Sequence, residues 1–200
     1  YGVFNLEPRN LSVEEINHIL MKRSFFKKPI DISKGNFFLC PARIGNMKNQ
    51  KILVKAAIKL PEKCNILLIG YREDPRYFDE LIRLISKNRL QDRVHVISQL
   101  PHDLLLSIMQ KSDFMIIPSY NENMPRCGLE AHALGIPVIA SNQGGHLEYV
   151  TEGKNGLFID PNDSDSVVEA IKKGIGNRDK LIPEKVENSY INKLVNIYQE

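Results

Sequence analysis

Apolar and polar positions divide this chain into alternating short and long segments. Five short runs consist mostly of apolar residues, many of them β-branched or aromatic, as is typical of strands buried on both faces of a sheet. They are NFFLC (36–40), CNILLIG (64–70), RVHVIS (93–98), DFMIIP (113–118) and IPVIAS (136–141). The longer segments repeat apolar residues at helical spacing. We therefore expect helices at 48–60, 75–88, 101–111, 127–134, 164–175 and 185–199.

This alternation predicts an α/β fold with a Rossmann-like open parallel sheet and helices on both faces. Apolar side chains at helical spacing should face its core: Ile52, Ala56, Ile58, Leu60, Leu81, Leu84 and Ile85. The 200 residues suit one domain that buries a substantial core. We divide it into a lead-in helix and connector (1–35), a sheet core (36–176) and a C-terminal helix (177–200).

The segment before the first strand begins with a helix signal. Ser12 stands three residues ahead of Glu15, which is the spacing of a capping box, so we expect a helix over 12–23. The basic and aromatic stretch KRSFFKKP (22–29) follows. It could contact a membrane surface or a partner, but we interpret it as a solvated connector because no long amphipathic helix accompanies it.

Composition and charge narrow the function. The net charge of +3, from 27 basic and 24 acidic residues, is too balanced for a nucleic-acid binder, whereas an anionic small ligand needs only two or three cations. Cys40, Cys64 and Cys127 form no C-x-x-C pair, so we expect reduced thiols in a cytoplasmic protein. No apolar run approaches the ~18 residues of a membrane span. Because the chain begins with Tyr1 rather than Met, it is either processed or a piece of a longer protein, and we expect the latter.

Several cofactor motifs are absent from the sequence. Neither G-x-G-x-x-G nor G-x-x-x-x-G-K-[ST] occurs, which argues against a nicotinamide or flavin cofactor and against an ATPase-type phosphate loop. The segment DSD (163–165) could suggest a metal, but Pro161 ends a strand before it and a helical pattern begins after it. We interpret Asp163 or Ser164 as an N-cap and Asp165 as a first-turn charge. The five histidines lack ligand spacing, so we expect no metal.

Three cations follow the first predicted strand in PARIGNMKNQK (41–51). Arg43 comes at the carboxyl edge of the sheet, where open α/β sheets bind ligands, and Lys48 and Lys51 lie near the start of the next helix. The first turn of that helix contains no Asp or Glu, and each cation there opposes the helix dipole by ~0.3 to 1 kcal/mol. A bound anion would remove this conflict; the alternative is that these are ordinary surface lysines.

Two glutamates, Glu122 and Glu130, stand with seven residues between them in SYNENMPRCGLEAHALG (119–135). A buried strand ends at Ser119, a loop follows, and a short helix should be closed by Gly135. The core-facing residues of this helix should be Leu129, Ala133 and Leu134. We expect Glu130 in its first turn, near backbone N–H groups that suit a phosphate.

Two glycines, Gly144 and Gly145, follow the next strand and should allow the backbone to approach a ligand closely. Taken singly, each feature has a simpler explanation, since Glu130 could complement the helix dipole and Glu122 could be a solvated loop residue. Together with Arg43 and Lys48, the pattern becomes specific.

The patterns R-x4-K-N-Q (43–50) and P-S-x2-E-x7-E-A-x3-G-x-P-V-I-A-S-x2-G-G (118–145) resemble the group 1 family of retaining glycosyltransferases. This family has the two-domain GT-B fold, and the resemblance runs from about Asn36 to Asp165, with weaker echoes at both ends. Strand context, order and spacing of the motifs all agree. The resemblance implies that the chain is the C-terminal, donor-binding half of such an enzyme.

The resemblance also implies roles for individual residues. Arg43 and Lys48 would bind the diphosphate of a nucleoside-diphosphate sugar and stabilise the departing nucleoside diphosphate without a metal. Glu130 would accept hydrogen bonds from the ribose hydroxyls. Glu122 would contact the donor sugar and would be the catalytic carboxylate. The nucleotide base is expected near Ser98 and Gln99.

The loop after Glu122 departs from the common family form, in which a glycine, an aromatic residue and a second glycine follow the glutamate. The residues expected to bind the donor here are Asn123, Met124, Pro125, Arg126 and Cys127. Because Pro125 has no N–H, contacts that the family makes through backbone N–H groups are in doubt at this position. The sugar that is transferred therefore stays open.

Other functions remain as alternatives. In the family the acceptor binds an N-terminal domain, which these residues do not supply, so we expect weak donor binding and little transfer by this part alone. A full-length enzyme could also contact a membrane peripherally. A glycosidase with Glu122 and Glu130 facing each other at ~5 to 9 Å would leave Arg43 and Lys48 without a task. A non-catalytic nucleotide-sugar-binding module and a related two-domain epimerase are the other candidates.

Overall fold

Six parallel strands form one sheet in the computed structural model, which describes residues 6–183. The predicted α/β class is confirmed, and so are the five predicted strands. A sixth strand precedes Pro161, where the sequence indicated only that a strand ends. The strands are β1 (Asn36–Pro41), β2 (Cys64–Ile69), β3 (Val94–Ile97), β4 (Phe114–Ile117), β5 (Val138–Ser141) and β6 (Gly156–Ile159).

The strand order in the sheet is β3-β2-β1-β4-β5-β6. The first strand, β1, lies in the middle of the sheet, and β2 and β3 extend the sheet from it to one edge. The chain then returns to place β4 beside β1 in parallel, with Leu39 opposite Met115. The direction of winding therefore reverses between β1 and β4. Loops that leave the carboxyl ends of these two strands diverge there and open a crevice, which is where doubly wound sheets bind ligands.

Helices connect the strands in the predicted order. They are α1 (Val13–Arg23), α2 (Gln50–Lys59), α3 (Pro75–Lys87), α4 (His102–Met109), α5 (Arg126–Ala133) and α6 (Ser164–Gly176), with 3-10 turns η1 (Asn46–Lys48), η2 (Gly144–Glu148) and η3 (Arg178–Lys180). The predicted helix at 185–199 lies outside the described residues. In residues 6–183, no helix combines the length and apolarity that crossing a bilayer would require.

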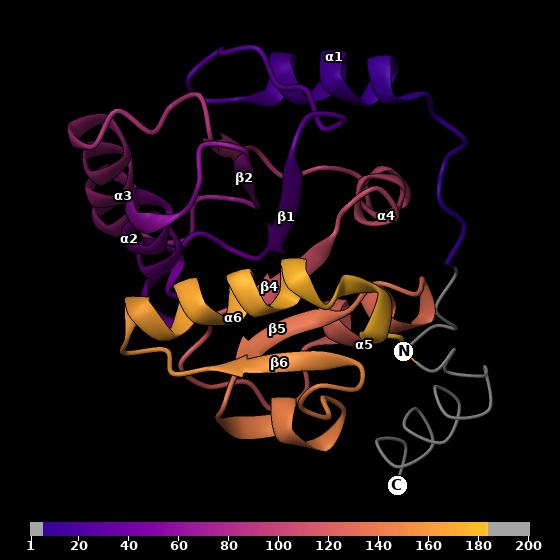
Figure 1. Cartoon of the computed structure of the whole chain (residues 1–200). Helices are drawn as coiled ribbons and strands as arrows, with labels where there is room; N and C mark the ends of the chain where they lie inside the picture. The colour runs from indigo at the N-terminus through magenta and orange to yellow at the C-terminus, as the bar shows by residue number, and fades with distance from the viewer. Residues whose placement is uncertain (1–5, 184–200) are drawn as a thin grey trace, which may run out of the picture.

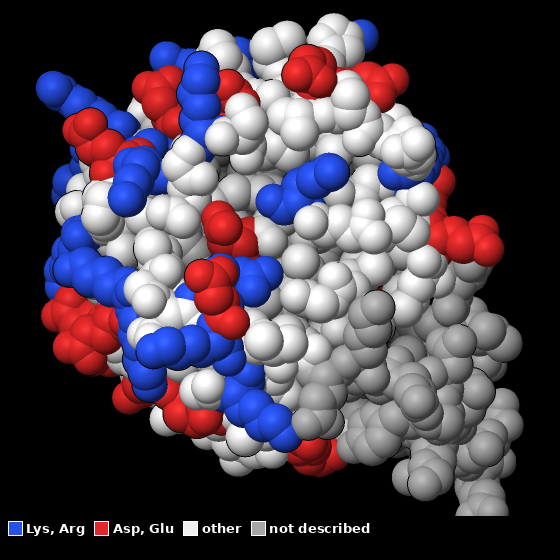
Figure 2. Space-filling model, turned by 45° about the vertical axis from the view of Figure 1, so that its right-hand side comes forward, with Lys and Arg blue, Asp and Glu red and all other residues white. Residues whose placement is uncertain are grey.

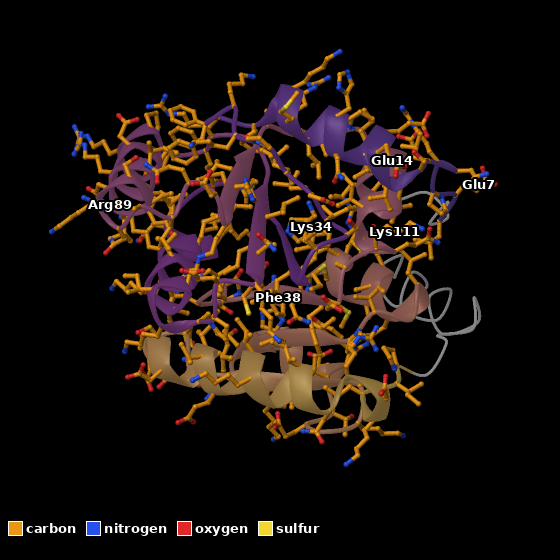
Figure 3. All side chains as sticks on the ribbon, turned by 45° about the horizontal axis from the view of Figure 1, so that its top comes forward. Glu7, Glu14, Lys34, Phe38, Arg89 and Lys111 are labelled. Atoms are coloured by element: carbon orange, nitrogen blue, oxygen red, sulfur yellow. The ribbon has the colours of Figure 1, made fainter. Side chains whose placement is uncertain are left out.

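Each strand buries side chains on both faces of the sheet, because successive residues of a strand point in opposite directions. Phe38 and Cys40 of β1 pack in a core with α2, α3 and α6, whereas Phe37 and Leu39 pack in a second core with α1, α4 and α5. Figure 1 shows the strands between these groups of helices. Phe38 lies in the middle of the molecule in Figure 3 and stacks on Phe114 with ring centroids 6.1 Å apart.

Local signals account for the helix ends. Ser12 and Glu15 form the predicted capping box, in which Glu15 N–H donates to Ser12 Oγ and Ser12 N–H donates to the Glu15 carboxylate. Asp163 accepts from the N–H groups of Asp165 and Ser166, which confirms the capping role of DSD. A group of three or more His, Cys, Asp or Glu side chains that could hold a metal is not found among residues 6–183.

Two expectations about α2 are wrong. The helix does not run continuously from 48, because Asn49 has a left-handed backbone conformation (φ 54°) and separates η1 from α2. Ile58 is 50% exposed rather than buried. It lies two positions after the core residue Ala56, and residues two apart on a helix do not share a face.

The basic segment 22–29 joins α1 to the sheet edge. Ser24 forms an isolated antiparallel bridge with Ile97 of β3, and Phe25 N–H donates to the carbonyl of Val96 (2.8 Å). The Phe25 ring is half exposed and packs edge-on against Phe26 and Phe78. Basic and acidic side chains are interspersed over the face shown in Figure 2.

Candidate functional site

A cleft of about 410 Å³ opens at the carboxyl ends of β1 and β4, where the winding of the sheet reverses. Its walls come from residues 40–43 after β1, residues 116–119 at the end of β4, and the loop that leads into α5. The hydroxyl of Ser119 is buried on this wall and has no hydrogen-bond partner within residues 6–183. Seven predicted site residues line this cleft, and two of them, Arg43 and Lys48, are the predicted diphosphate ligands. The other five are Glu122, Met124, Pro125, Arg126 and Cys127.

Lys48 and Glu122 form an ion pair in the cleft. Lys48 is the last residue of η1 and Glu122 lies in the loop after β4, so the sheet order brings together residues that are 74 positions apart. Their side chains are only 15% and 16% exposed. The pair is therefore largely shielded from water. Two charges in such an environment attract each other more strongly than they would on an open surface.

Arg43 stands at the mouth of the same cleft and is half exposed. Its guanidinium forms an ion pair with Glu73 from the loop after β2. A hydrogen bond with the Tyr71 side chain and the charge of Glu73 both raise the pKa of Arg43 above its ordinary value. Both cations predicted to bind an anion are thus held by carboxylates in this structure.

Helix α5 points its N-terminus at the cleft. It begins at Arg126, with Pro125 at the N-cap and no side-chain hydrogen bond capping it. Arg126 and Cys127 of its first turn line the cleft, and burial raises the pKa of the Cys127 thiol to about 12, so the thiol is protonated at neutral pH. Because the helix starts one residue earlier than expected, Glu130 lies in its second turn, which corrects the predicted first-turn position.

Glu130 is buried, with 9% of its side chain exposed, and it does not line the cleft itself. Its Oε1 lies 3.0 Å from Nε2 of His102, the first residue of α4, whose side chain is half exposed. Within residues 6–183, His102 is the side-chain hydrogen-bond partner of Glu130. The role of His102 was not predicted from the sequence. The available signal was its position at the start of the helix that follows a predicted strand, since that edge of the sheet carries the site.

The glycines Gly144 and Gly145 pack against the loop that carries Glu122. Gly145 N–H donates to the Glu122 carbonyl (2.8 Å), and a Cβ on Gly145 would lie 1.6 Å from the Asn123 carbonyl oxygen. The close approach that these glycines allow is to the loop that carries Glu122. The contact supports the backbone of the Glu122 loop, and the approach of these glycines to a ligand stays a prediction.

Besides Glu130, three predicted residues lie outside the cleft wall. Asn123 is exposed, and its carbonyl oxygen faces Gly145. Ser98 and Gln99 are exposed directly after β3, two strands away from β1 in the sheet order. They share the carboxyl edge of the sheet with the cleft, on the side where His102 and Glu130 meet.

The sequence profile described as "Glycosyl transferases group 1" matches residues 21–190 of this chain. The chain belongs to the group 1 glycosyltransferase family. Relatives in this family include the D-inositol 3-phosphate glycosyltransferase of Corynebacterium urealyticum, which is 31% identical over 150 residues (70% of this chain and 35% of that protein). The Mycolicibacterium smegmatis enzyme of the same name is 30% identical over 137 residues, 66% of this chain and 31% of that protein. This chain thus spans about a third of the length of these relatives.

Solved structures share the GT-B-type fold of this group 1 domain. Anabaena HepE in complex with UDP-glucose superposes with a TM-score of 0.76 at 23% identity, over 94% of this chain and 49% of HepE. The C-terminal domain of the group 1 protein LpcC from Francisella tularensis matches with a TM-score of 0.70 at 20% identity, over 100% of this chain and 98% of that domain. The fold is that of a C-terminal domain of a GT-B glycosyltransferase.

Proposed function

We propose that this chain is the donor-binding domain of a retaining, metal-independent glycosyltransferase. The full protein would transfer a sugar, of hexose type, from a nucleoside-diphosphate sugar to an acceptor held by an N-terminal domain, in the cytoplasm. The observation that carries this proposal is the meeting of Arg43, Lys48 and Glu122 in one cleft at the reversal point of the sheet. Such a crevice with two cations and a helix N-terminus suits a diphosphate.

Charge neutralisation is the first task of the site. When a sugar leaves its nucleoside diphosphate, negative charge grows on the diphosphate, and fixed cations that meet it there lower the barrier. Arg43 and Lys48 would exchange their present partners, Glu73 and Glu122, for phosphate oxygens. The α5 N-terminus would add its dipole on the same wall, which supports charge neutralisation without a metal.

Glu122 supplies the second task. Once Lys48 turns to phosphate, the Glu122 carboxylate becomes available to the donor sugar and the reacting carbon. Gly145 N–H donates to the Glu122 carbonyl, so the backbone at Glu122 is held while the partner of its carboxylate changes. This supports a catalytic role for Glu122 in stabilising the positive charge that develops on the sugar.

Glu130 and His102 would bind the ribose. A carboxylate can accept both hydroxyls of a vicinal diol, and Glu130 offers one oxygen while His102 engages the other. The nearby residues Ser98 and Gln99 are the proposed base contacts. Met124 and Pro125 line the sugar side, so they are the proposed determinants of which sugar is accepted.

Calorimetric titration of the domain with UDP, GDP and ADP tests this function. The HepE structure is a complex with UDP-glucose, which makes UDP the first nucleotide to try. We expect heat with at least one nucleotide, and Arg43→Ala or Lys48→Ala should abolish most of it. Lys173→Ala on α6, which breaks a surface ion pair with Glu152, is the matched control and should bind as the wild type. Absence of binding to all three nucleotides would refute the donor site.

The competing non-catalytic module predicts the same binding but no chemistry. Joining this domain to the N-terminal domain of its own full-length protein separates the two. A full-length protein that binds the nucleotide but neither hydrolyses nor transfers any sugar nucleotide would favour the module.

A further inference from the structure

Two neighbouring amide side chains, Asn49 and Gln50, are buried directly after Lys48. Asn49 is 6% exposed and Gln50 is 0% exposed. Buried amides at the start of a helix are expensive unless their N–H and C=O groups find partners. The side-chain NH2 of each residue donates to the backbone of a cleft-lining residue, Pro118 for Asn49 and Arg43 for Gln50, although neither amide lines the cleft itself.

Asn49 joins three segments of the carboxyl edge. Its Nδ2 donates to the Pro118 carbonyl (3.2 Å), at the end of β4, and to the Pro161 carbonyl (2.7 Å), after β6. Its backbone is left-handed, with φ 54° and ψ 33°, a conformation that asparagine tolerates better than most residues. Both N–H groups of the Asn49 side chain are therefore used to fix the backbone at the end of η1, directly after Lys48.

Gln50 holds the other cation-bearing segment. Its Nε2 donates to the Arg43 carbonyl (2.7 Å), and its Oε1 accepts from Gly45 N–H at 3.4 Å. The loop from Arg43 to Gly45 is thereby tied to the first turn of α2. Asn49 and Gln50 are consecutive residues at the start of α2. Gln50 ties the backbone at Arg43 to this helix start, and Asn49 ties the backbone next to Lys48 to the end of β4.

We propose that Asn49 and Gln50 are positioning residues that set the spacing of the Arg43 and Lys48 cations for a diphosphate. This rests on the proposed function. Ordering an Arg or Lys side chain on a ligand costs about 1.5 to 2 kcal/mol of rotamer entropy, so a backbone that already places both side chains within reach of one ligand leaves less of the binding energy to be spent on adjustment. Misplacement of a binding group by about 1 Å can cost up to roughly 100-fold in a reaction that depends on geometry. The carbonyls of Pro118 and Arg43 are the contacts through which the amides act.

The test compares Asn49→Gly with the same change made in a Lys48→Ala background. Glycine keeps the left-handed backbone but removes the amide, and Asn49→Asp keeps the shape but removes the donors, so it serves if Asn49→Gly folds poorly. Asn88→Gly is the control, because it removes an amide that donates to the Leu84 carbonyl (2.8 Å) at the end of α3. Calorimetry measures the affinity for inorganic pyrophosphate and UDP, and circular dichroism confirms folding at the assay temperature.

We expect Asn49→Gly to weaken pyrophosphate binding about tenfold when Lys48 is present and less than about twofold when it is alanine, because a residue that acts through another is non-additive with it. Gln50→Leu should behave likewise with Arg43→Ala. The positioning role would be overturned if Asn49→Gly lowered the affinity for pyrophosphate equally in both backgrounds, or if it lowered that affinity no more than Asn88→Gly does. Either result would leave the donor site intact. Failure of the wild type to bind pyrophosphate or any nucleotide would overturn both proposals.

Discussion

Replacing Glu130 by alanine should separate recognition of the ribose from recognition of the diphosphate. Glu130 is almost buried, and His102 engages one of its oxygens at 3.0 Å, so its carboxylate is already oriented before any ligand arrives. A hydrogen bond to a charged group contributes about 1.5 to 3 kcal/mol net. Two ribose hydroxyls should therefore contribute about 2 to 4 kcal/mol after partial solvation is allowed for, which corresponds to roughly 30- to 900-fold in affinity.

The assay is calorimetry with UDP, 2′-deoxy-UDP and inorganic pyrophosphate. Glu130→Ala should lose most of its affinity for UDP, lose its preference for UDP over the deoxy analogue, and keep wild-type affinity for pyrophosphate. Glu169→Ala removes an exposed glutamate on α6 and should leave all three affinities unchanged. Equal losses for UDP and pyrophosphate would refute the ribose assignment, because Glu130 would then act on the phosphate end or on the fold.

Three further outcomes follow from the structure. Gly145→Ala should destabilise the domain by about 1 to 3 kcal/mol in urea unfolding, because the new Cβ would overlap the Asn123 carbonyl; unchanged stability would contradict the packing of the Glu122 loop. Burial lowers the pKa of three histidines to about 4: His95, His132 and His146. The unfolded chain therefore binds protons more readily, so the free energy of unfolding should fall between pH 6.5 and 4, by roughly 1 to 2 kcal/mol per histidine at pH 5; equal stability at pH 5 and 7 would contradict this. Excess EDTA should leave UDP affinity unchanged, and loss of binding would point to a metal.

The order and type of the described elements could be predicted from the sequence because their causes are local. Buried parallel strands read as continuous apolar runs, and helices repeat apolar residues at a spacing that the chain itself displays. Caps such as Ser12 and Asp163 act within three residues of their partners. The break at Asn49 was missed because a left-handed residue leaves no mark on the hydrophobic pattern.

Part of the site could be predicted for a similar reason. Arg43 and Glu122 follow strands closely, and parallel strands bring their carboxyl ends to one edge of the sheet. The pairing partners could not be predicted. Glu73 on Arg43 and His102 on Glu130 come from loops and helices after other strands, so their contacts depend on strand order and helix placement.

For this protein, local sequence decides the α/β class, the described strands and helices, and which residues can carry the chemistry. The tertiary structure decides that β4 lies beside β1, and with it the Lys48–Glu122 pair across 74 residues and the support of the Glu122 loop by Gly145. The physical reason is that an apolar run favours burial of a strand but does not determine which strand pairs with it. That choice is made by the packing of both sheet faces at once.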